Sequence, residues 1–364
     1  MGKYRVAVIG HTGRGNYGHG IDTVWERFAD RCEIVGVADA DDAGRSQAAA
    51  RLKAPRAFAD YREMLDQTKP QIVGIGPRWI DEHLAMAVAT AERGIHIFME
   101  KPFCRTPEEA DTIIAALEKR RVKLALAHQT RYSPKLQVIR ELIQGGQLGE
   151  ILEIRGRGKE DARGGAEDLW VLGSHIMNLI HFFGGAPQWC AAQVLQAGQS
   201  ARREHVKSGN EGIGQLCGDQ VNAMFGLDDG VTAYFGSRKN APGGRFGIQI
   251  FGTKGIVEIA TGFLPGAFYL ADPSWSPGRS NAAWQPISSA GVARPETIQD
   301  EALAGNIAIV EDLLAAIEMD RDPECSAYEG RVTVEMICAV FDSHRQGKRV
   351  DFPLAYRRNP VEAF

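Results

Sequence analysis

Long apolar runs and blocks of like charge are both missing from this sequence. No stretch approaches the roughly 18 consecutive apolar residues of a membrane-spanning helix. The 42 Lys and Arg residues nearly balance the 46 Asp and Glu residues, and the formal net charge is −4. Because nucleic acids and anionic membranes attract basic patches, we expect neither as a partner. The chain opens on a strand pattern with no signal peptide, so we expect a cytoplasmic protein.

Cysteine pairs at metal-binding spacing are missing as well. The six cysteines are scattered and form no Cys-x-x-Cys pair, which argues against a zinc ribbon or a disulfide framework. No set of His, Cys, Asp and Glu has the spacing of a metal site, so we predict no metal. We expect the cysteines to be buried thiols.

The length and composition favour two ordinary globular domains. The chain has 364 residues, more than the roughly 250 to 300 at which one hydrophobic core stops growing. Hydrophobic residues make up 44% and charged residues 24% of the chain, which is usual for a water-soluble protein.

A glycine-rich loop follows the first apolar run. Residues 4–9 read as a strand, residues 10–18 are Gly-His-Thr-Gly-Arg-Gly-Asn-Tyr-Gly, and a helical pattern follows. In this arrangement backbone N–H groups and a helix N-terminus can hold a pyrophosphate. Position 12 is Thr where the usual spacing has glycine. The predicted cofactor contacts of this loop are Gly10, Thr12, Gly13, Arg14 and Gly15.

The second strand pattern, residues 33–38, ends in Asp39. An acidic side chain at this point can accept both ribose hydroxyls of an adenosine and repels a 2′-phosphate. The sequence therefore favours NAD over NADP. The alternative is that Asp39 and its neighbours cap the helix expected over residues 43–52, and both roles can hold together.

Strands and helices go on alternating to residue 128. This pattern predicts a right-handed, parallel, doubly wound domain over residues 1–128. The apolar run 95–99 reads as a buried strand and ends in Glu100, Lys101 and Pro102. Ligands bind at such strand ends in open α/β sheets. The other expected elements are helices over 61–65, 81–93 and 107–119, and strands over 71–75 and 122–127.

From residue 129 the pattern changes to strands without long helices between them, which predicts a mainly antiparallel open sheet in an α+β domain over residues 129–364. Residues 262–300 are rich in Pro, Gly and Ser and read as long loops. Residues 168–183 have apolar side chains at helical spacing, which predicts one helix. The expected strands are 151–155, 189–195, 221–227, 232–236, 246–251, 255–260 and 349–352, and the other helices end at 143 or span 306–319 and 330–343.

Several of these motifs together resemble the Gfo/Idh/MocA family of oxidoreductases. The resemblance covers the whole chain, and Glu-Lys-Pro at 100–102 is its most specific part. It implies a Rossmann domain followed by a domain whose open sheet builds homodimers or homotetramers. It also implies that Lys101 reaches both the substrate and the nicotinamide. The motifs are the glycine loop, Asp39, Pro77 followed by His83, the run Gly94-Ile-His-Ile-Phe-Met-Glu-Lys-Pro102 and the turn Gly149-Glu-Ile, and the implied cofactor contacts include Pro77, His83, Glu100 and Lys101.

The resemblance also points to a proton-transfer histidine. In the family, the helix that matches residues 168–183 carries an Asp and, four residues later, a His that exchanges a proton with a substrate hydroxyl. His175 matches that His, but the Asp position is Val171 here. Asp168 lies one turn earlier on the same face of the expected helix, so we hypothesise that it reaches the same pocket. A histidine on a buried helix without a catalytic role is the alternative for His175.

The loop before this helix offers candidate substrate contacts. Lys159, Glu160 and Arg163 lie among glycines and supply the several donors and acceptors that a polyol needs. A solvated turn is the alternative. Asn178 and His181 are either substrate contacts or helix surface. The predicted substrate-binding set is Lys101, Arg131, Lys159, Arg163, His175 and Asn178.

These observations predict an NAD-dependent dehydrogenase or reductase that acts on a sugar, cyclitol or glycoside. His175, helped by Asp168, would take the hydroxyl proton, Lys101 would hold the oxygen, and hydride would pass to NAD. Two alternatives stay open. One is redox-neutral glycoside cleavage with tightly bound NAD, by oxidation, elimination and re-reduction. The other is a non-catalytic dinucleotide-binding protein.

Overall fold

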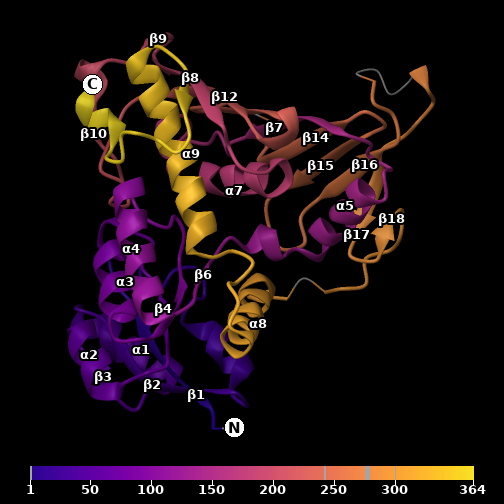
Figure 1. Cartoon of the computed structure of the whole chain (residues 1–364). Coiled ribbons are helices and arrows are strands. Elements are labelled where there is room, and N and C mark those ends of the chain that lie inside the picture. Colours follow the sequence, from indigo (N-terminus) through magenta and orange to yellow (C-terminus); the bar gives the residue numbers. More distant parts are fainter. Residues whose placement is uncertain (1, 242, 275–278, 300) are drawn as a thin grey trace. The chain divides into compact units, whose positions relative to one another are not determined.

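In this computed structural model the described residues are 2–241, 243–274, 279–299 and 301–364. The chain divides into two compact units (Figure 1). Unit 1 comprises Met1–Ala127, Asn210–Gly214 and Asn306–Val334, and unit 2 comprises His128–Gly209, Gln215–Gly305 and Glu335–Phe364. The sequence predicts a boundary after residue 128. In the structure the first boundary follows residue 127, one residue earlier. The segments Asn210–Gly214 and Asn306–Val334, which the prediction assigns to the second domain, belong to unit 1.

Unit 1 is built on a six-stranded sheet in which every pair is parallel. The strand order is β3-β2-β1-β4-β5-β6, so the chain reverses direction across the sheet between β1 and β4. This confirms the predicted doubly wound fold, and such reversal points are where ligands bind. The strands are β1 (Tyr4–Ile9), β2 (Cys32–Ala38), β3 (Ala57–Phe58), β4 (Ile72–Ile75), β5 (His96–Met99) and β6 (Leu124–Leu126).

Capping side chains mark the starts of α1, α2 and α4 in unit 1. Asp41 accepts a hydrogen bond from the Gly44 N–H at the start of α1, and Thr106 does the same for Glu109 at the start of α4, as expected of N-cap residues. The helices are α1 (Asp42–Leu52), α2 (Tyr61–Thr68), α3 (His83–Ala91), α4 (Pro107–Arg120), α8 (Ala304–Met319), the first part of α9 (Ala327–Gln346), and the 3₁₀ turns η1 (Thr23–Phe28) and η2 (Ile80–Glu82).

The element after the glycine loop differs from the expected helix. It is η1, a 3₁₀ helix of six residues that begins only at Thr23. Gly13, Gly15, Gly18 and Gly20 all have φ between +68° and +89°. That conformation is open to glycine but cannot continue a right-handed helix. The loop therefore lacks the long helix whose N-terminus the sequence assigns to a pyrophosphate.

Unit 2 contains an eleven-stranded sheet with the order β18-β17-β16-β15-β14-β7-β13-β12-β8-β19 and with β9 beside β8. All of its pairs are antiparallel except β7 with β13, which confirms the mainly antiparallel prediction. Its strands are β7 (Ile151–Arg157), β8 (Trp189–Gln196), β9 (Gln199–Ser200), β12 (Gln220–Gly226), β13 (Thr232–Arg238), β14 (Gly247–Gly252), β15 (Ile256–Ala260), β16 (Ala267–Leu270), β17 (Gln285–Ser288), β18 (Gly291–Val292) and β19 (Val350–Asp351).

Helices cover one face of this sheet. α7 (Gly173–Gly184) packs on β7, β13 and β14 (Figure 1). Gly156 of β7 makes room for it, because a Cβ there would lie 2.4 Å from a methyl group of Ile176. The remaining elements of unit 2 are α5 (Pro134–Gln144), α6 (Ala166–Val171), the rest of α9, a two-stranded sheet of β10 (Lys207–Ser208) and β11 (Gln215–Leu216), and the short turns η3 (Gln129–Tyr132), η4 (Arg203–His205), η5 (Asp228–Gly230) and η7 (Pro360–Ala363).

The prediction of long loops over residues 262–300 is wrong in part, because β16, β17 and β18 lie there. These strands have four residues or fewer, too few to show a period among prolines and glycines. β16 extends the sheet by pairing with β15, and β17 pairs with β16 even though Pro286 lies in it. Residues 275–278 and 300 of this range lie outside the described residues.

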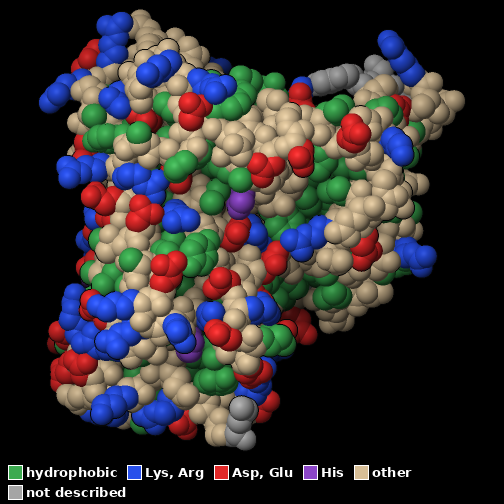
Figure 2. Space-filling model, in the orientation of Figure 1, with side chains coloured by type: hydrophobic (Ala, Val, Ile, Leu, Met, Phe, Trp, Pro, Cys, Tyr) green, Lys and Arg blue, Asp and Glu red, His purple; other side chains and the backbone are tan. Residues whose placement is uncertain are grey.

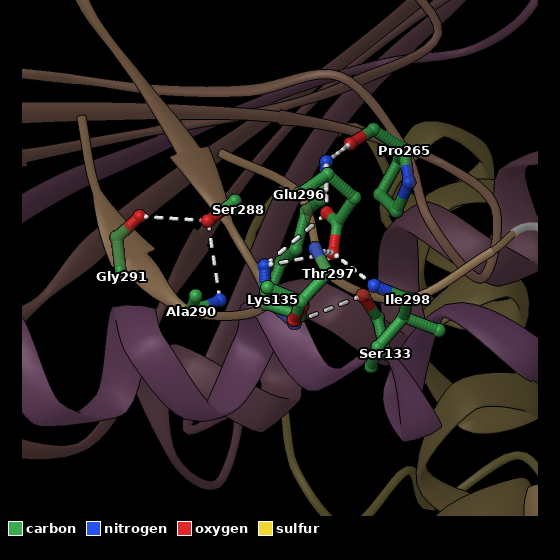
Figure 3. A network of polar contacts seen from close by, with 10 residues as sticks. Ser133, Lys135, Pro265, Ser288, Ala290, Gly291, Glu296, Thr297 and Ile298 are labelled. Carbon is green, nitrogen blue, oxygen red and sulfur yellow. Dashed lines mark hydrogen bonds and ion pairs between the residues drawn. The ribbon is translucent and has the colours of Figure 1, made fainter. Parts of the chain in front are cut away.

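A polar network anchors the β17–β18 end of the sheet on α5 (Figure 3). The Glu296 carboxylate accepts hydrogen bonds from the backbone N–H groups of Thr297 and Ile298 at 3.1 and 3.2 Å and from Ser289. Lys135 Nζ donates to the Pro265 carbonyl at 2.8 Å and lies 3.6 Å from Glu296. Burial raises the pKa of Glu296, but these donors outweigh burial and lower it to about 2. Glu296 is therefore a permanent anion at neutral pH.

The surface and the thiols agree with the sequence. On the face in Figure 2, Lys and Arg side chains are interspersed with Asp and Glu. All six cysteines are free and buried, as expected. Among the described residues no helix is long and apolar enough to span a bilayer, and no group of three or more His, Cys, Asp and Glu could hold a metal ion.

Candidate active site

The carboxyl edge of the unit 1 sheet gathers the predicted cofactor residues. The glycine loop follows β1, Asp39 follows β2, Pro77 follows β4 and Lys101 follows β5. Parallel strands end at the same edge, so the fold alone brings these positions to one side of the sheet.

Asp39 is the polar centre of this edge. Its side chain is 1% exposed. The carboxylate accepts hydrogen bonds from Thr12 Oγ1 at 2.7 Å, Tyr17 Oη at 2.9 Å and the Asp41 N–H at 3.0 Å. Asp41, rather than Asp39, caps α1. The threonine at position 12, where the usual spacing has glycine, thus fixes the acidic side chain, and Gly44 leaves room for it, since a Cβ there would lie 1.9 Å from Thr12 Oγ1.

Tyr17 is a member of this edge that the sequence does not reveal. Its ring lies against Gly10, where a Cβ would be 2.2 Å from the nearest ring carbon. Burial raises the pKa of the Tyr17 hydroxyl, and the hydrogen bond to Asp39 raises it further. The hydroxyl therefore stays a donor to Asp39. The only hint in the sequence is an aromatic residue in the middle of a glycine loop.

A cavity of about 210 Å³ opens beside Asp39. It lies at the ends of β1 and β2, where the adenosine half of a dinucleotide binds in this fold. Gly13 has φ +83° and nothing within 4 Å of the place of a Cβ, so the loop backbone can approach a ligand closely. These features fit a dinucleotide. The lining residues include Gly10, His11, Asp39, Asp60, Arg62 and Met86.

Arg14 is directed toward the segment after β4. It forms an ion pair with Asp81, and its guanidinium lies 4.4 Å from the centre of the Trp79 ring. Residues 210–214 reach the same place, where the Ile80 N–H donates to the Glu211 carbonyl at 3.0 Å. This late segment of unit 1 is absent from the sequence-based site.

His83 ties the ends of two strands together. It is fully buried, with Nε2 2.7 Å from the Pro77 carbonyl oxygen and Nδ1 2.9 Å from that of Pro102. The two carbonyls follow β4 and β5, which are neighbours in the sheet. His83 therefore fixes the turn that carries Lys101.

Glu100 and Lys101 are both buried, with exposures of 1% and 7%. Glu100 accepts from the His19 N–H at 2.7 Å and from the Lys101 N–H at 3.0 Å. Burial raises the pKa of Glu100, but hydrogen bonding by His19 and the Lys101 charge outweigh burial and lower it. His19, held in turn by Asn306 at 2.8 Å, is a second residue that sequence reasoning misses. The turn thus presents an ammonium group next to a fixed carboxylate.

In unit 2, His175 lies in the first turn of α7. Its Nδ1 is 3.4 Å from Nδ1 of His128, and the two rings pack edge to face with centroids 5.1 Å apart. The Phe246 ring packs edge to face on His175 as well, at 6.3 Å. His175 is half-buried, whereas His128 is 2% exposed. The sequence does not indicate this pair, because 47 residues separate its members.

The single helix expected over 168–183 is two helices, α6 and α7, that break at Leu172, where φ is −116°. Gly173 allows the break through a close approach, since a Cβ there would lie 3.0 Å from the Phe235 ring. The argument that Asp168 and His175 share one helical face is therefore wrong.

Asp168 is fully buried beneath the loop that precedes α6. Its carboxylate accepts from Ser237 Oγ at 2.5 Å and from the N–H groups of Lys159 and Glu160 at 3.3 and 3.1 Å. Burial raises the pKa of Asp168, and these hydrogen bonds lower it in part. In the structure Asp168 organises the loop, and its part in proton transfer stays a prediction.

Glu160 has a similar place in that loop. It is 3% exposed, pairs with Arg157 and Arg245, and accepts the Arg238 N–H at 3.0 Å. Lys159 and Arg163, both predicted substrate contacts, instead converge on Asp161, at 3.6 and 2.9 Å. The hydrogen bond from Arg163 lowers the pKa of Asp161 to about 2.

The other predicted substrate residues are distributed over η3 and α7. The Arg131 guanidinium lies 4.8 Å from the centre of the Phe182 ring. Asn178 is 1% exposed, and His181 Nδ1 lies 3.0 Å from the Gly185 carbonyl at the end of α7. His181 is thus a helix-end residue, and the substrate roles of Arg131 and Asn178 stay predictions.

Two parts of the chain match models of known protein families. Residues 4–128 match the model of an oxidoreductase family with an NAD-binding Rossmann fold, and residues 136–258 match the GFO/IDH/MocA C-terminal domain.

Several curated proteins are similar in sequence. Levoglucosan dehydrogenase of Pseudarthrobacter phenanthrenivorans is 25% identical over 248 residues, 61% of this chain and 63% of that protein. D-apiose dehydrogenase of Paraburkholderia graminis is 22% identical over 339 residues, 89% and 84% of the two chains. The NADP(+)-dependent scyllo-inositol 2-dehydrogenase of Bacillus subtilis is 30% identical over 138 residues, 35% and 37%. The chain thus spans less than two thirds of the first and third of these relatives.

Among solved structures, levoglucosan dehydrogenase in complex with NADH and L-sorbose superposes with a TM-score of 0.76. The match covers 97% of this chain and 100% of that one, at 19% identity. At this identity the likeness concerns the fold.

Proposed function

The chain belongs to the Gfo/Idh/MocA family of oxidoreductases, and on this basis we propose that it transfers a hydride between a nicotinamide cofactor and a secondary alcohol or ketone of a carbohydrate. The observation that carries the proposal is the buried Lys101 beside the Glu100 carboxylate, at the same sheet edge as the Asp39 cavity. Burial of an ammonium group costs desolvation free energy, so a buried lysine at a strand end is a candidate for a functional role.

The proposed chemistry divides between Lys101 and His175. Bound NAD supplies the hydride acceptor for alcohol oxidation. Lys101 holds the substrate oxygen and stabilises the negative charge that develops on it, as a preorganised cation does in a site shielded from water. The Glu100 carboxylate accepts the Lys101 N–H and so fixes the Lys101 backbone. His175 takes the hydroxyl proton as general base.

We propose NAD as the preferred cofactor. Asp39 and Asp60 both line the cavity at the ends of β1 and β2, and carboxylates there disfavour a 2′-phosphate. The residues that would hold the dinucleotide are Gly10, Thr12, Gly13, Arg14, Gly15, Asp39, Pro77, His83, Glu100 and Lys101.

The substrate we propose is a sugar, cyclitol or glycoside. The names of the relatives point to levoglucosan, D-apiose and scyllo-inositol for those enzymes, all of which carry several hydroxyl groups. Arg131, Lys159, Arg163 and Asn178 are the proposed contacts to such hydroxyls.

We also propose a homodimer or homotetramer that forms through the unit 2 sheet. The face opposite α7 carries a row across neighbouring strands that includes Phe268, Glu258, Arg155, Tyr234 and Met224. Tyr234 and Phe268 are 38% and 40% exposed, which is unusual for large apolar residues on a monomer surface. Sedimentation of the native chain and of Tyr234→Arg tests this, and a native monomer would refute it.

The test of the activity is the absorbance at 340 nm of the purified chain with NAD, over a panel of sugars, inositols and aryl glycosides. We expect a substrate-dependent rise that is lost in Lys101→Ala. Lys123→Ala is the matched control, because Lys123 pairs with Asp320 at 3.1 Å on another part of unit 1. Release of aglycone with no rise at 340 nm would replace this proposal with the redox-neutral cleavage mechanism.

A further inference from the structure

The contact between His128 and His175 restricts the protonation of both rings. A hydrogen bond between two Nδ1 atoms at 3.4 Å needs one nitrogen that carries a proton and one that does not. Two neutral imidazoles satisfy it only as complementary tautomers, with the proton on Nδ1 of one ring and on Nε2 of the other. The structure therefore allows two arrangements of the pair.

If His175 acts as the general base, only one of the two tautomer arrangements is possible. Because Nδ1 of His175 is engaged by His128, the proton exchanged with the substrate passes through Nε2. Nε2 can accept that proton only if it is bare, so the neutral His175 must carry its proton on Nδ1 and donate it to His128. His128 must then be the acceptor, with its own proton on Nε2.

The position of His128 is well fixed. It precedes η3, and its carbonyl accepts the Arg131 N–H at 3.0 Å. Thr130 of the same turn accepts the Gly262 N–H at 2.8 Å, and η3 packs against α7. His128 is 2% exposed, so water competes little for its ring nitrogen.

Another candidate for orienting His175 has its acceptors engaged elsewhere. The Asp168 carboxylate accepts from Ser237 and from two backbone N–H groups of the 159–160 loop. The position four residues before His175 is Val171, whose side chain cannot accept a hydrogen bond.

We infer that His128 is the positioning residue of the His175 base, holding it in the tautomer with the proton on Nδ1 and with Nε2 unprotonated, so that Nε2 can take the proton of a substrate hydroxyl. The inference rests on the proposed function, since it takes His175 as the base. In alcohol oxidation the hydroxyl proton moves to His175 Nε2, the carbinol hydride leaves to the nicotinamide, and the C–O bond becomes a carbonyl. The imidazolium that results keeps its Nδ1 hydrogen bond to His128.

The tautomer can be measured without substrate. Long-range ¹H–¹⁵N correlation spectra of the full chain with ¹⁵N-labelled histidine, at a pH where both rings are neutral, distinguish the two tautomers. We expect the proton of His175 on Nδ1 and that of His128 on Nε2, with signals assigned from the His128 and His175 variants. The opposite arrangement in the native chain would overturn the inference.

Two substitutions sharpen the test. His128→Phe keeps a ring but removes the acceptor, so we expect His175 to change to the Nε2–H tautomer and kcat to fall about ten- to a hundredfold with little change in KM. His128→Asn keeps an acceptor near the Nδ1 position, so we expect it to retain the native tautomer and most of kcat. An unchanged tautomer in His128→Phe would also overturn the inference.

Controls separate this inference from the proposed function. His181→Phe, in the same helix, should leave the His175 tautomer unchanged. If the tautomers are as expected but no alcohol is oxidised, the positioning by His128 stands and the proposed function fails. If an alcohol is oxidised and His128→Phe retains full kcat, the function stands and the positioning role fails.

Discussion

Each unit contains deeply buried carboxylates, and Asp39 and Glu100 of unit 1 differ from Glu160 and Asp168 of unit 2 in what surrounds them. In unit 1, Asp39 lines a cavity and Glu100 stands beside a buried lysine. In unit 2, Glu160 pairs with Arg157 at the end of β7 and with Arg245, and Asp168 accepts hydrogen bonds from the Glu160 N–H and from Ser237 of β13. Burial of an acid therefore indicates a binding role only where an open space or a cation that can bind a ligand lies next to it.

The largest effect expected from this difference concerns the lysine adjacent to a buried carboxylate in each unit, Lys101 after Glu100 and Lys159 before Glu160. Lys101→Ala should lower kcat/KM by about 10² to 10⁴, because it removes the cation that stabilises the developing charge. Lys159→Ala should lower kcat/KM by less than about tenfold, since Lys159 is half exposed and lies near Asp161. Steady-state NADH formation measures both. Equal losses in the two variants would remove the distinction between the units.

The next effect is on stability. Glu160→Gln should lower the free energy of unfolding of unit 2 by about 2 kcal/mol, because the buried carboxylate loses its charge-assisted hydrogen bonds to Arg157 and Arg245. Urea unfolding measures the loss. The affinity for NAD should be unchanged in this variant, and a large loss of NAD binding would show that the loop is part of the cofactor site.

Asp39 provides a smaller and more specific test. Asp39→Asn should raise the Kd for NAD by about tenfold, because the charged group that accepts the ribose hydroxyls is lost. The ratio of the Kd for NADP to the Kd for NAD should fall, because the charge that repels a 2′-phosphate is lost as well. Asp41→Asn is the matched control, since asparagine caps a helix as well as aspartate. Fluorescence titration of each variant with NAD and with NADP measures these dissociation constants. Similar affinities in Asp39→Asn and the native chain would contradict the assigned role.

The smallest expected effect concerns the network around Glu296. Its pKa in the folded chain, about 2, lies below the usual value of about 4.3 for an unfolded Glu. The stabilisation is therefore present above pH of about 4.3 and is lost as the pH falls toward 2. Glu296→Gln should lower Tm by about 2 °C at pH 7 and by less at pH 3. A Tm difference that grows on acidification would contradict this sign.

The sequence predicts the parts of the fold that depend on neighbouring residues. Strand ends such as Asp39 and Lys101 are placed by the alternation of apolar runs and turns, and α1 and α4 begin at their capping residues. The strands between 262 and 300 are missed because they have four residues or fewer, too few to show a period, and form by pairing with one another and with β15.

The parts of the site that the sequence misses depend on contacts between distant segments. Tyr17 and His19 gain their roles only when the glycine loop folds over Asp39 and Glu100. His128 meets His175 through the packing of η3 on α7. The helix break at Leu172 lies beside Gly173, which Phe235 of a distant strand approaches closely. The spacing of apolar residues within one segment does not predict any of these contacts.

The most direct test of hydride transfer uses a substrate from the panel that carries deuterium at the carbinol carbon. Mass spectrometry of the reduced cofactor after turnover measures where that deuterium goes. We expect one deuterium per reduced nicotinamide, located at C4, and a slower or absent reaction in Lys101→Ala. Reduced cofactor without deuterium, or product formed with no reduced cofactor at all, would contradict this expectation.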